Sequence, residues 1–172
     1  ITMAGAIAIA RAIRKEYNIS ALIKWPNDIF IGDKKVAGLL LELAAEADTV
    51  HYALLGIGID ANISLADLPS DLQKTITSLK DEVGHEVDRV ALLARILREF
   101  ELRYRQLEDG EYDSIIREWK TLSLTLEHRV VIKTINKTFE GEAIDIDRHG
   151  ALIIRKDNGE VERVIAGDCF QF

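Results

Sequence analysis

Two lysines, an asparagine and an aspartate lie within one short stretch of the chain. Lys24, Asn27 and Asp28 flank a Trp-Pro dipeptide, and Lys35 follows after a Gly-Asp turn. A carboxylate and an ammonium group that share one site could flank a bound phosphate, the carboxylate through a divalent cation and the ammonium directly. Phosphate chemistry is therefore the first hypothesis for this stretch.

The stretch is predicted to form a β-hairpin, because Gly32-Asp33 is a typical two-residue loop. Apolar residues on both sides of the loop predict strands over residues 28–31 and 35–43. In this register, Asp28 lies opposite Ala37.

The register also decides which lysine meets the carboxylate. A two-residue loop places Lys35 opposite Phe30 and makes it a diagonal neighbour of Asp28, roughly 5–8 Å away. A loop one residue longer would put Lys34 in that place, so this geometry leaves the two lysines open. On residue types alone, such a pair is typical of a surface ion pair worth at most about 1 kcal/mol.

Other elements must hold the hairpin in place. Residues 2–17, rich in Ala and Ile, predict a helix, and residues 20–25 predict a short strand. Residues 50–60 predict a further strand that ends in Gly56-Ile57-Gly58. Glycine inside a strand marks a bulge or a close approach of the backbone to another group. These glycines lack the third glycine and the following helix of a dinucleotide fingerprint.

The pattern changes after residue 60. A helix is predicted over residues 70–83 with Ser70 as its N-cap, and the clearest helical pattern covers residues 88–108. A further helix is predicted over residues 111–121. The apolar stripe of the 88–108 helix is predicted to consist of Val90, Leu93, Leu97, Phe100, Leu102 and Tyr104.

The C-terminal part predicts a small barrel, because short strands separated by tight turns are typical of that architecture. The strands are predicted over residues 129–135, 139–146, 151–156, 161–165 and 169–172. A domain boundary near residues 122–127 follows.

The composition is that of a globular protein. The chain has 172 residues, of which 48% are apolar and 30% charged, and its formal net charge is −7. The acidic balance argues against nucleic-acid binding, and no apolar run reaches the length of about 18 residues that predicts a membrane span. Cys169 is the single cysteine and cannot form an internal disulfide, so a reducing, cytoplasmic setting is expected.

Three ordered motifs resemble the biotin–protein ligase family. They are Lys-Trp-Pro-Asn-Asp at residues 24–28, Lys-Val-Ala-Gly-Leu-Leu-Leu-Glu at residues 35–42 and Gly-Ile-Gly-Ile-Asp-Ala-Asn at residues 56–62. Segments at residues 141–143, 150–152 and 166–168 look like the small SH3-like domain of that family. In effect, the resemblance covers the whole chain.

The resemblance implies an α+β fold in two domains. Residues 1–124 would form a catalytic domain, with a mixed β-sheet and packed helices like those of class II aminoacyl-tRNA synthetases. Residues 125–172 would form an SH3-like barrel. Family members often dimerise through the sheet of the catalytic domain, so the resemblance also points to a homodimer.

The implied activity is a two-step, AMP-forming ligation. Biotin and ATP first give biotinyl-5′-AMP, and biotin then passes to one lysine of a biotin carboxyl carrier protein. A carboxylate must attack a polyanionic α-phosphate, so positive charge has to offset the repulsion. By resemblance, Lys35 contacts the biotin carboxylate and the adenylate phosphate, and Lys24 adds positive charge; these two are the implied catalytic residues.

The resemblance also assigns the remaining site residues. Asp28 would hold Mg²⁺, and Asn27 would orient the phosphates. The wall around the biotin rings would comprise Gly38, Leu40, Gly56 and Gly58. Asp60 and Asn62 would complete the nucleotide-binding set.

The chain departs from the family pattern in two places. The family's Gly-Arg-Gly-x-x-Gly-Arg-x-Trp loop does not occur in the sequence, and the chain opens on Ile1 rather than Met. We therefore expect further sequence before Ile1. Asp60 stands where the family usually has Asn, and an acid there could bind metal or weaken nucleotide binding.

Two alternatives stay open at this point. The chain could be a ligase remnant that binds biotin or a carrier protein without catalysis, as the missing loop and Asp60 suggest. It could also be a lipoate–protein ligase, although lipoate enzymes resemble the Lys-Trp-Pro-Asn-Asp motif less closely. No N-terminal winged helix is in view, so the sequence gives no sign of DNA binding.

Overall fold

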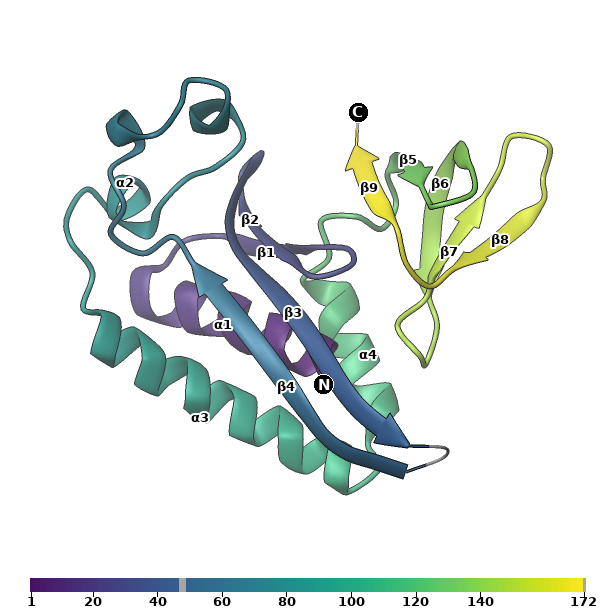
Figure 1. Cartoon of the computed structure of the whole chain (residues 1–172), viewed down its shortest axis with the longest axis horizontal. Coiled ribbons are helices and arrows are strands. Elements are labelled where there is room, and N and C mark those ends of the chain that lie inside the picture. Colours follow the sequence, from purple (N-terminus) through teal and green to yellow (C-terminus); the bar gives the residue numbers. More distant parts are fainter. Residues whose placement is uncertain (47–48, 172) are drawn as a thin grey trace.

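The computed structural model describes residues 1–46 and 49–171 and contains helices and two β-sheets. Figure 1 shows the helices gathered around the first sheet and the second sheet formed by the C-terminal strands. This arrangement confirms the predicted α+β class. Within the described ranges, no helix combines the length and hydropathy needed to cross a bilayer.

Helix α1 (Thr2–Tyr17) lies at the centre of the N-terminal part and matches the predicted helix. Nearly all of its side chains from Ala4 to Ile13 are buried, which is why it is apolar on every side. It contacts the first sheet as well as helices α3 and α4 (Figure 1). The approach to the sheet is close, because a Cβ on Gly5 would lie 2.8 Å from the side chains of Leu39 and Leu55.

The first sheet has four strands in sequence order. They are β1 (Ala21–Lys24), β2 (Asp28–Ile31), β3 (Lys34–Glu46) and β4 (Thr49–Ile59). All three strand pairs are antiparallel. In the described part of the chain, parallel pairing occurs only as isolated bridges, Ile23 with Ser123 and Lys35 with Ile76. The mixed character expected of the sheet is therefore limited to these bridges.

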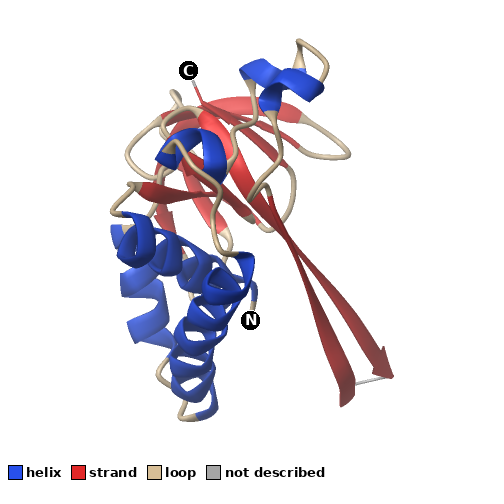
Figure 2. Cartoon of the chain, turned by 90° about the vertical axis from the view of Figure 1, so that its left-hand side faces the viewer, coloured by secondary structure: helices blue, strands red, loops and turns tan. Residues whose placement is uncertain are grey.

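Strands β3 and β4 form a long ribbon that extends away from the helices, as Figure 2 shows. Apolar side chains on this ribbon are open to solvent, among them Leu40, Leu43, Tyr52 and Leu54. The ribbon thus leaves an apolar surface that the chain itself does not cover.

The prediction of one helix over residues 70–83 is wrong. The structure has two 3-10 helices, η1 (Leu65–Asp67) and η2 (Leu72–Lys74), followed by the short helix α2 (Leu79–Val83). The N-cap of α2 is Ser78, not Ser70, and its hydroxyl accepts a hydrogen bond from the Asp81 N–H. The intervening residues leave helical geometry because they bond to the edge of strand β3.

Helix α3 (Arg89–Glu108) has the predicted bounds, and Asp88 caps it by accepting hydrogen bonds from two backbone N–H groups. The predicted apolar stripe is not the buried face of this helix, because Val90, Leu93 and Leu97 are exposed. The side chains that α3 buries are Leu92, Ile96, Glu99 and Arg103.

Glu99 and Arg103 are buried because they pair with each other and with charges on neighbouring helices. Arg103 bonds to Glu99 and to Glu118 of helix α4 (Tyr112–Thr121). From α1, Lys15 reaches Glu99 at 2.7 Å and Arg11 reaches Glu118 at 2.7 Å. This helix ion network, defined by these five residues, joins α1, α3 and α4.

The C-terminal part contains the five predicted strands in one antiparallel sheet. They are β5 (Arg129–Lys133), β6 (Thr138–Ile146), β7 (Leu152–Arg155), β8 (Val161–Val164) and β9 (Asp168–Gln171). Their order in the sheet is β8-β7-β6-β5-β9. The closer assignment as an SH3-like barrel stays a prediction.

Trp25 joins the two sheets. Its indole N–H donates to the Gly150 carbonyl at 3.0 Å, and its backbone N–H donates to the buried hydroxyl of Thr125 at 2.9 Å. The segment between α4 and β5 also bonds to Ile23 of β1. The Ile23 N–H donates to the Leu122 carbonyl, and the Ile23 carbonyl accepts from the Leu124 N–H. The C-terminal sheet is therefore fixed to the same turn that carries Asn27 and Asp28.

Candidate functional site

A single row of residues crosses all four strands of the first sheet. Lys24 lies opposite Asp28, Asp28 lies opposite Gly38, and Gly38 lies opposite Gly58. Directly opposed residues in antiparallel strands lie on the same face of a sheet. The row thus has charged side chains at one end and bare backbone at the other.

An irregularity in the hairpin beside Lys35 changes which residue lies opposite Asp28. The predicted pairing of Phe30 with Lys35 is confirmed, but the register then shifts between Ile29 and Phe30. Asp28 therefore lies opposite Gly38 rather than Ala37, which corrects the predicted register. A bulge adds one residue to one strand and redirects its side chains.

Lys35 and Asp28 are in direct contact. The Lys35 Nζ atom lies 2.6 Å from Oδ1 of Asp28, and both side chains are partly exposed. Gly38 makes room for this ion pair, because a Cβ at that position would lie 3.0 Å from Lys35 Nζ and 3.1 Å from Asp28 Oδ1. The glycine and the ion pair are thus parts of one arrangement.

The structure also separates the two lysines that the sequence left open. Lys34 turns away from the carboxylate, and its Nζ donates to the Gln73 carbonyl at 3.1 Å. Lys35 is therefore the lysine of the site.

Gly56 and Gly58 keep the far end of the row open. A Cβ on Gly56 would meet nothing closer than the Leu40 carbonyl oxygen at 3.6 Å, and one on Gly58 nothing closer than 4.0 Å. Leu40 lies opposite Gly56 and is 62% exposed. Since α1 packs against Leu39 on the other face, Gly56 and Gly58 form a strip without side chains on the face turned away from the helix, with Leu40 beside it.

Lys24 and Asn27 flank the row. The Lys24 ammonium lies 4.8 Å from the centre of the Phe30 ring, a cation–π contact that keeps the charge beside Asp28. The Asn27 side-chain amide donates to the Leu39 carbonyl, and its backbone carbonyl accepts from the Leu39 N–H at 2.9 Å. Asn27 therefore fixes the turn to β3, and its contact with phosphate stays a prediction.

Asp60 lies just beyond the end of β4 and is half-buried. Burial raises the pKa of its carboxyl group, and the nearby Lys35 charge opposes part of that rise. Its backbone N–H donates to the Val36 carbonyl at 2.9 Å, so Asp60 is held beside the lysine-bearing strand. The site thus contains two carboxylates that face one ammonium group.

Asn62 occupies a different position. Its side-chain nitrogen donates to the Val87 carbonyl at 2.9 Å, and its side-chain oxygen accepts from the Val87 N–H at 2.8 Å. The Asn62 amide thus binds the backbone of Val87 through both its nitrogen and its oxygen, a contact that we call the backbone clamp. The nucleotide role of Asn62 stays a prediction, and the structure shows a role in holding the chain after α2.

Sequence reasoning missed the residues that bond to the Lys35 backbone. The Lys35 N–H donates to the Thr75 carbonyl at 2.9 Å, and the Lys35 carbonyl accepts from the Thr77 N–H at 2.8 Å. The available signal was weak, since Thr75-Ile76-Thr77 alternates as a strand does but was assigned to a helix.

The carboxylates fit a magnesium ion that arrives with phosphate groups. Among the described residues, no three His, Cys, Asp or Glu side chains gather closely enough to hold a metal by themselves. Mg²⁺ is usually bound by one or two carboxylates together with substrate phosphates. Asp28 can supply such a ligand, because its side chain is partly exposed on the open face.

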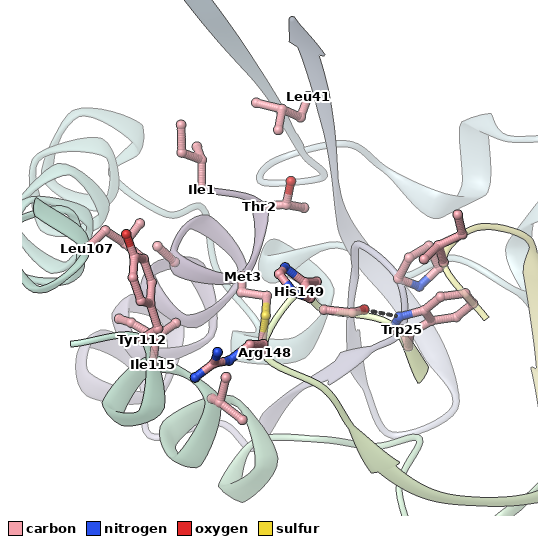
Figure 3. A pocket seen from close by; sticks show the side chains of 15 residues that line it. Ile1, Thr2, Met3, Trp25, Leu41, Leu107, Tyr112, Ile115, Arg148 and His149 are labelled. Carbon is pink, nitrogen blue, oxygen red and sulfur yellow. Dashed lines mark hydrogen bonds between the residues drawn. The ribbon is translucent and has the colours of Figure 1, made fainter. Parts of the chain in front are cut away.

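A separate pocket of about 410 Å³ lies between the N-terminus of α1, helix α4 and the C-terminal sheet. Figure 3 shows Met3, Tyr112, Arg148 and His149 around it, with the hydrogen bond of Trp25 at its side. Lys35 and Asp28 do not line this pocket. It is a junction between the two parts of the molecule rather than the site of the lysine.

Two family models match the chain. The "Biotin/lipoate A/B protein ligase family" matches residues 1–60, and the "Biotin protein ligase C terminal domain" matches residues 125–170. The first match includes the whole row from Lys24 to Gly58. The two matches thus place the chain in the class of biotin and lipoate ligases.

Relatives narrow this class. The chain is 34% identical over 168 residues to the "Bifunctional ligase/repressor BirA" of Bacillus subtilis, covering 98% of this chain and 51% of that protein. It is 31% identical over 140 residues to the "Biotin--[acetyl-CoA-carboxylase] ligase" of Paracoccus denitrificans, covering 80% of this chain and 58% of that protein. The chain therefore spans between half and three fifths of the length of these two relatives.

Solved structures share the fold. The biotin protein ligase of Aquifex aeolicus in complex with biotin and ATP superposes with a TM-score of 0.84 at 21% identity, covering 99% of this chain and 70% of that one. With the two family models and the relatives, this places the chain plainly: it belongs to the biotin protein ligase family.

Proposed function

We propose that this chain forms the catalytic and C-terminal regions of a biotin–protein ligase. The reaction would join biotin and ATP to give biotinyl-5′-AMP and pyrophosphate. A lysine amine of a carrier protein would then attack the biotinyl carbonyl, form an amide and release AMP. The observation that carries the proposal is the row Lys24, Asp28, Gly38 and Gly58, with Lys35 at its charged end.

The charged end suits the attack of a carboxylate on a phosphate. Both reactants are anions, so fixed positive charge must offset their repulsion as they approach. Lys35 and Lys24 supply two ammonium groups at this end of the row, and neither is buried away from the open face. Lys35 would contact the biotin carboxylate and the α-phosphate, and Lys24 would add charge beside them.

The bare end suits the fused rings of biotin. A ring system can lie directly against backbone where side chains are missing. Gly56 and Gly58 leave that space, and Leu40 supplies an apolar edge. Gly38 would lie where the ring system meets the carboxylate tail.

Asp28 would hold Mg²⁺ together with the phosphates of ATP. The ion, when bound, would neutralise part of the triphosphate charge. Asn27 would orient the phosphates, and Asp60 and Asn62 would lie at the nucleotide end. Because Asp60 replaces an asparagine of the family pattern, its ionisation would affect nucleotide affinity.

Further parts of the proposal concern organisation. We place the domain boundary between residues 124 and 125, where the C-terminal family match begins. A homodimer through the exposed β3–β4 ribbon and a biotin carboxyl carrier protein as acceptor follow from the family. The cytoplasmic setting rests on the single cysteine, Cys169.

The test is a transfer assay with the protein as its gene encodes it. A biotin carboxyl carrier domain is incubated with ATP, Mg²⁺ and either biotin or lipoate, and its intact mass is measured. The proposal expects the mass increase of one biotinyl group and none from lipoate. Modification by lipoate alone would favour the lipoate ligase alternative, and no modification would favour a binding remnant.

A further inference from the structure

The segment Thr75–Ser78 lies along the edge of β3 where β4 has already ended. Pairing between β3 and β4 stops at Ala37 and Ile59, two residues beyond Lys35. The Lys35 backbone would otherwise have a free edge there. Instead its N–H donates to Thr75 and its carbonyl accepts from Thr77, as in a two-bond strand pairing. We call residues 75–78 the lysine strap.

The strap is anchored from its other side. Thr77 is only 2% exposed, and its hydroxyl donates to Glu82 Oε1 at 2.6 Å. Ser78 is fully buried and caps α2, as described above. Helix α2 therefore holds the strap by the side chains of two consecutive buried residues.

The same segment also holds the end of β4. The Leu79 N–H donates to the Asp60 carbonyl and the Lys80 N–H donates to the Ala61 carbonyl, both at 2.8 Å. One short stretch, residues 75–80, thus bonds to the backbone of Lys35 and to the backbone of Asp60. The distance between the ammonium and this carboxylate depends on it.

We propose that the lysine strap is a positioning device for Lys35, with Thr77 as the positioning residue. Thr77 touches no reacting atom in this assignment. It fixes the backbone from which the Lys35 ammonium reaches Asp28 and the phosphate position. The inference rests on the proposed ligase function, but its main test does not use that activity.

The geometry explains why such a device is needed. Lys35 lies at a register shift, where the pairing of β2 and β3 is interrupted. Bulged residues lack part of the ladder that would otherwise fix them. A lysine that must meet one phosphate oxygen loses rate steeply when it is displaced by about 1 Å. The strap supplies the backbone contacts that the interrupted ladder does not.

The first measurement is the reactivity of the Lys35 amine. The protein is treated briefly with an acetylating reagent, and acetylation of each lysine is quantified by peptide mass spectrometry with Lys133 as internal reference. Thr77→Val removes the hydroxyl that donates to Glu82. Glu82→Ala removes the acceptor of the same hydrogen bond, at an exposed residue. We expect both variants to raise the relative rate at Lys35 by about threefold, as its ion pair loosens.

Matched variants separate positioning from general destabilisation. Thr77→Ser keeps the hydroxyl and should restore the natural Lys35 rate. Thr134→Val removes a threonine hydrogen bond in the turn between β5 and β6, far along the chain from the site, and should leave Lys35 unchanged. A lowered unfolding midpoint with an unchanged Lys35 rate in both Thr77→Val and Glu82→Ala would overturn the inference.

Adenylate kinetics supply the second readout. Thr77→Val should lower kcat by about tenfold while the KM for biotin changes less than about twofold, because position rather than binding is affected. If the natural protein makes no adenylate, the ligase proposal fails and the acetylation result still decides the strap. If the natural protein makes adenylate and Thr77→Val retains full kcat, the strap inference fails while the ligase proposal stands.

Discussion

Asp28 lies opposite Gly38 because of a local irregularity that spacing alone does not reveal. The hairpin loop, with Gly32 in the left-handed region at φ 59°, pairs Phe30 with Lys35 as the sequence predicts. The following shift sets Asp28 opposite Gly38, and the Lys35 ammonium contacts the Asp28 carboxylate. The open backbone beside the ion pair depends on this one-residue difference.

Replacing each of the two adjacent lysines tests this placement. Lys35→Ala should slow adenylate formation by about a hundredfold or more, because it removes positive charge from the reacting anions. Lys34→Ala is the matched control, since Lys34 bonds to the Gln73 carbonyl instead. Rates of biotinyl-5′-AMP formation measure both, and equal losses in the two variants would contradict the assignment.

A valine at Gly58 tests the open end of the row. A Cβ there meets nothing within 4 Å except the Gly38 carbonyl at 4.0 Å, so the sheet has room for the side chain. Valine also favours strands, so the thermal midpoint should hold or rise. Biotin affinity by calorimetry should fall by more than about tenfold, because the side chain fills the ligand's place. Unchanged affinity in a folded variant would show that biotin lies elsewhere.

The candidate residues could be found from the sequence, but their exact pairing could not. The motif order and the glycine positions predicted the charged and bare ends of the site. The register shift between Ile29 and Phe30 could not be predicted from residue types, since either strand could have carried the extra residue. The backbone clamp of Asn62 on Val87 depends on a contact 25 residues away, beyond any local pattern.

At the scale of elements, the helices α1, α3 and α4 are joined by buried charge as well as by apolar packing. Glu99 and Arg103 are 3% and 8% exposed and pair with each other. Glu99 also pairs with Lys15, and Arg103 also pairs with Glu118, which in turn pairs with Arg11. A helical pattern assigns charged residues to the solvent side, so the predicted buried face of α3 was wrong. Charged residues can be buried when they are paired, which the pattern does not show.

Arg103→Met should therefore destabilise the protein strongly. Removing Arg103 leaves the buried Glu99 paired with Lys15 alone and the partly buried Glu118 paired with Arg11 alone, at a cost of up to about 3 kcal/mol in the free energy of unfolding at pH 7. Urea unfolding measures this, and Arg105→Met is the control, since its ion pair with Glu101 lies on the surface. Similar losses in both variants would contradict the role of the network.

The same network sets a dependence on pH. Burial by itself raises the pKa of Glu99 and Glu118, but hydrogen bonds from Lys15, Arg103 and Arg11 outweigh it, and both values lie below the ordinary 4.5. A depressed pKa adds stability above the unfolded-state value and loses it as the pH falls through the folded-state value. The difference between the natural protein and Arg103→Met should therefore shrink below pH 4.5. A difference that stays constant down to acid unfolding would argue against these carboxylates.

At the scale of the whole molecule, Trp25 couples the site to the C-terminal sheet. The residue follows Lys24 in the sequence, is 2% exposed and bonds to both Thr125 and Gly150. The sequence predicted the five C-terminal strands and a boundary near residues 122–127. It did not predict how that sheet docks, because the contacts join residues 100 and 125 positions apart.

Trp25→Phe tests this junction while retaining an aromatic ring. The Gly150 carbonyl would lose its donor, which should lower the free energy of unfolding by about 1–2 kcal/mol. Urea unfolding followed by circular dichroism gives the value. A variant as stable as the natural protein would mean that the indole bond does not hold the two sheets together.

The most direct test of the account is the detection of biotinyl-5′-AMP. The protein as its gene encodes it is mixed with biotin, ATP and Mg²⁺, and the bound product is identified by mass, with Lys35→Ala beside it. The account predicts adenylate with the natural protein and almost none with the variant. Absence of adenylate from both would contradict the ligase assignment, and equal amounts from both would remove Lys35 from the chemistry.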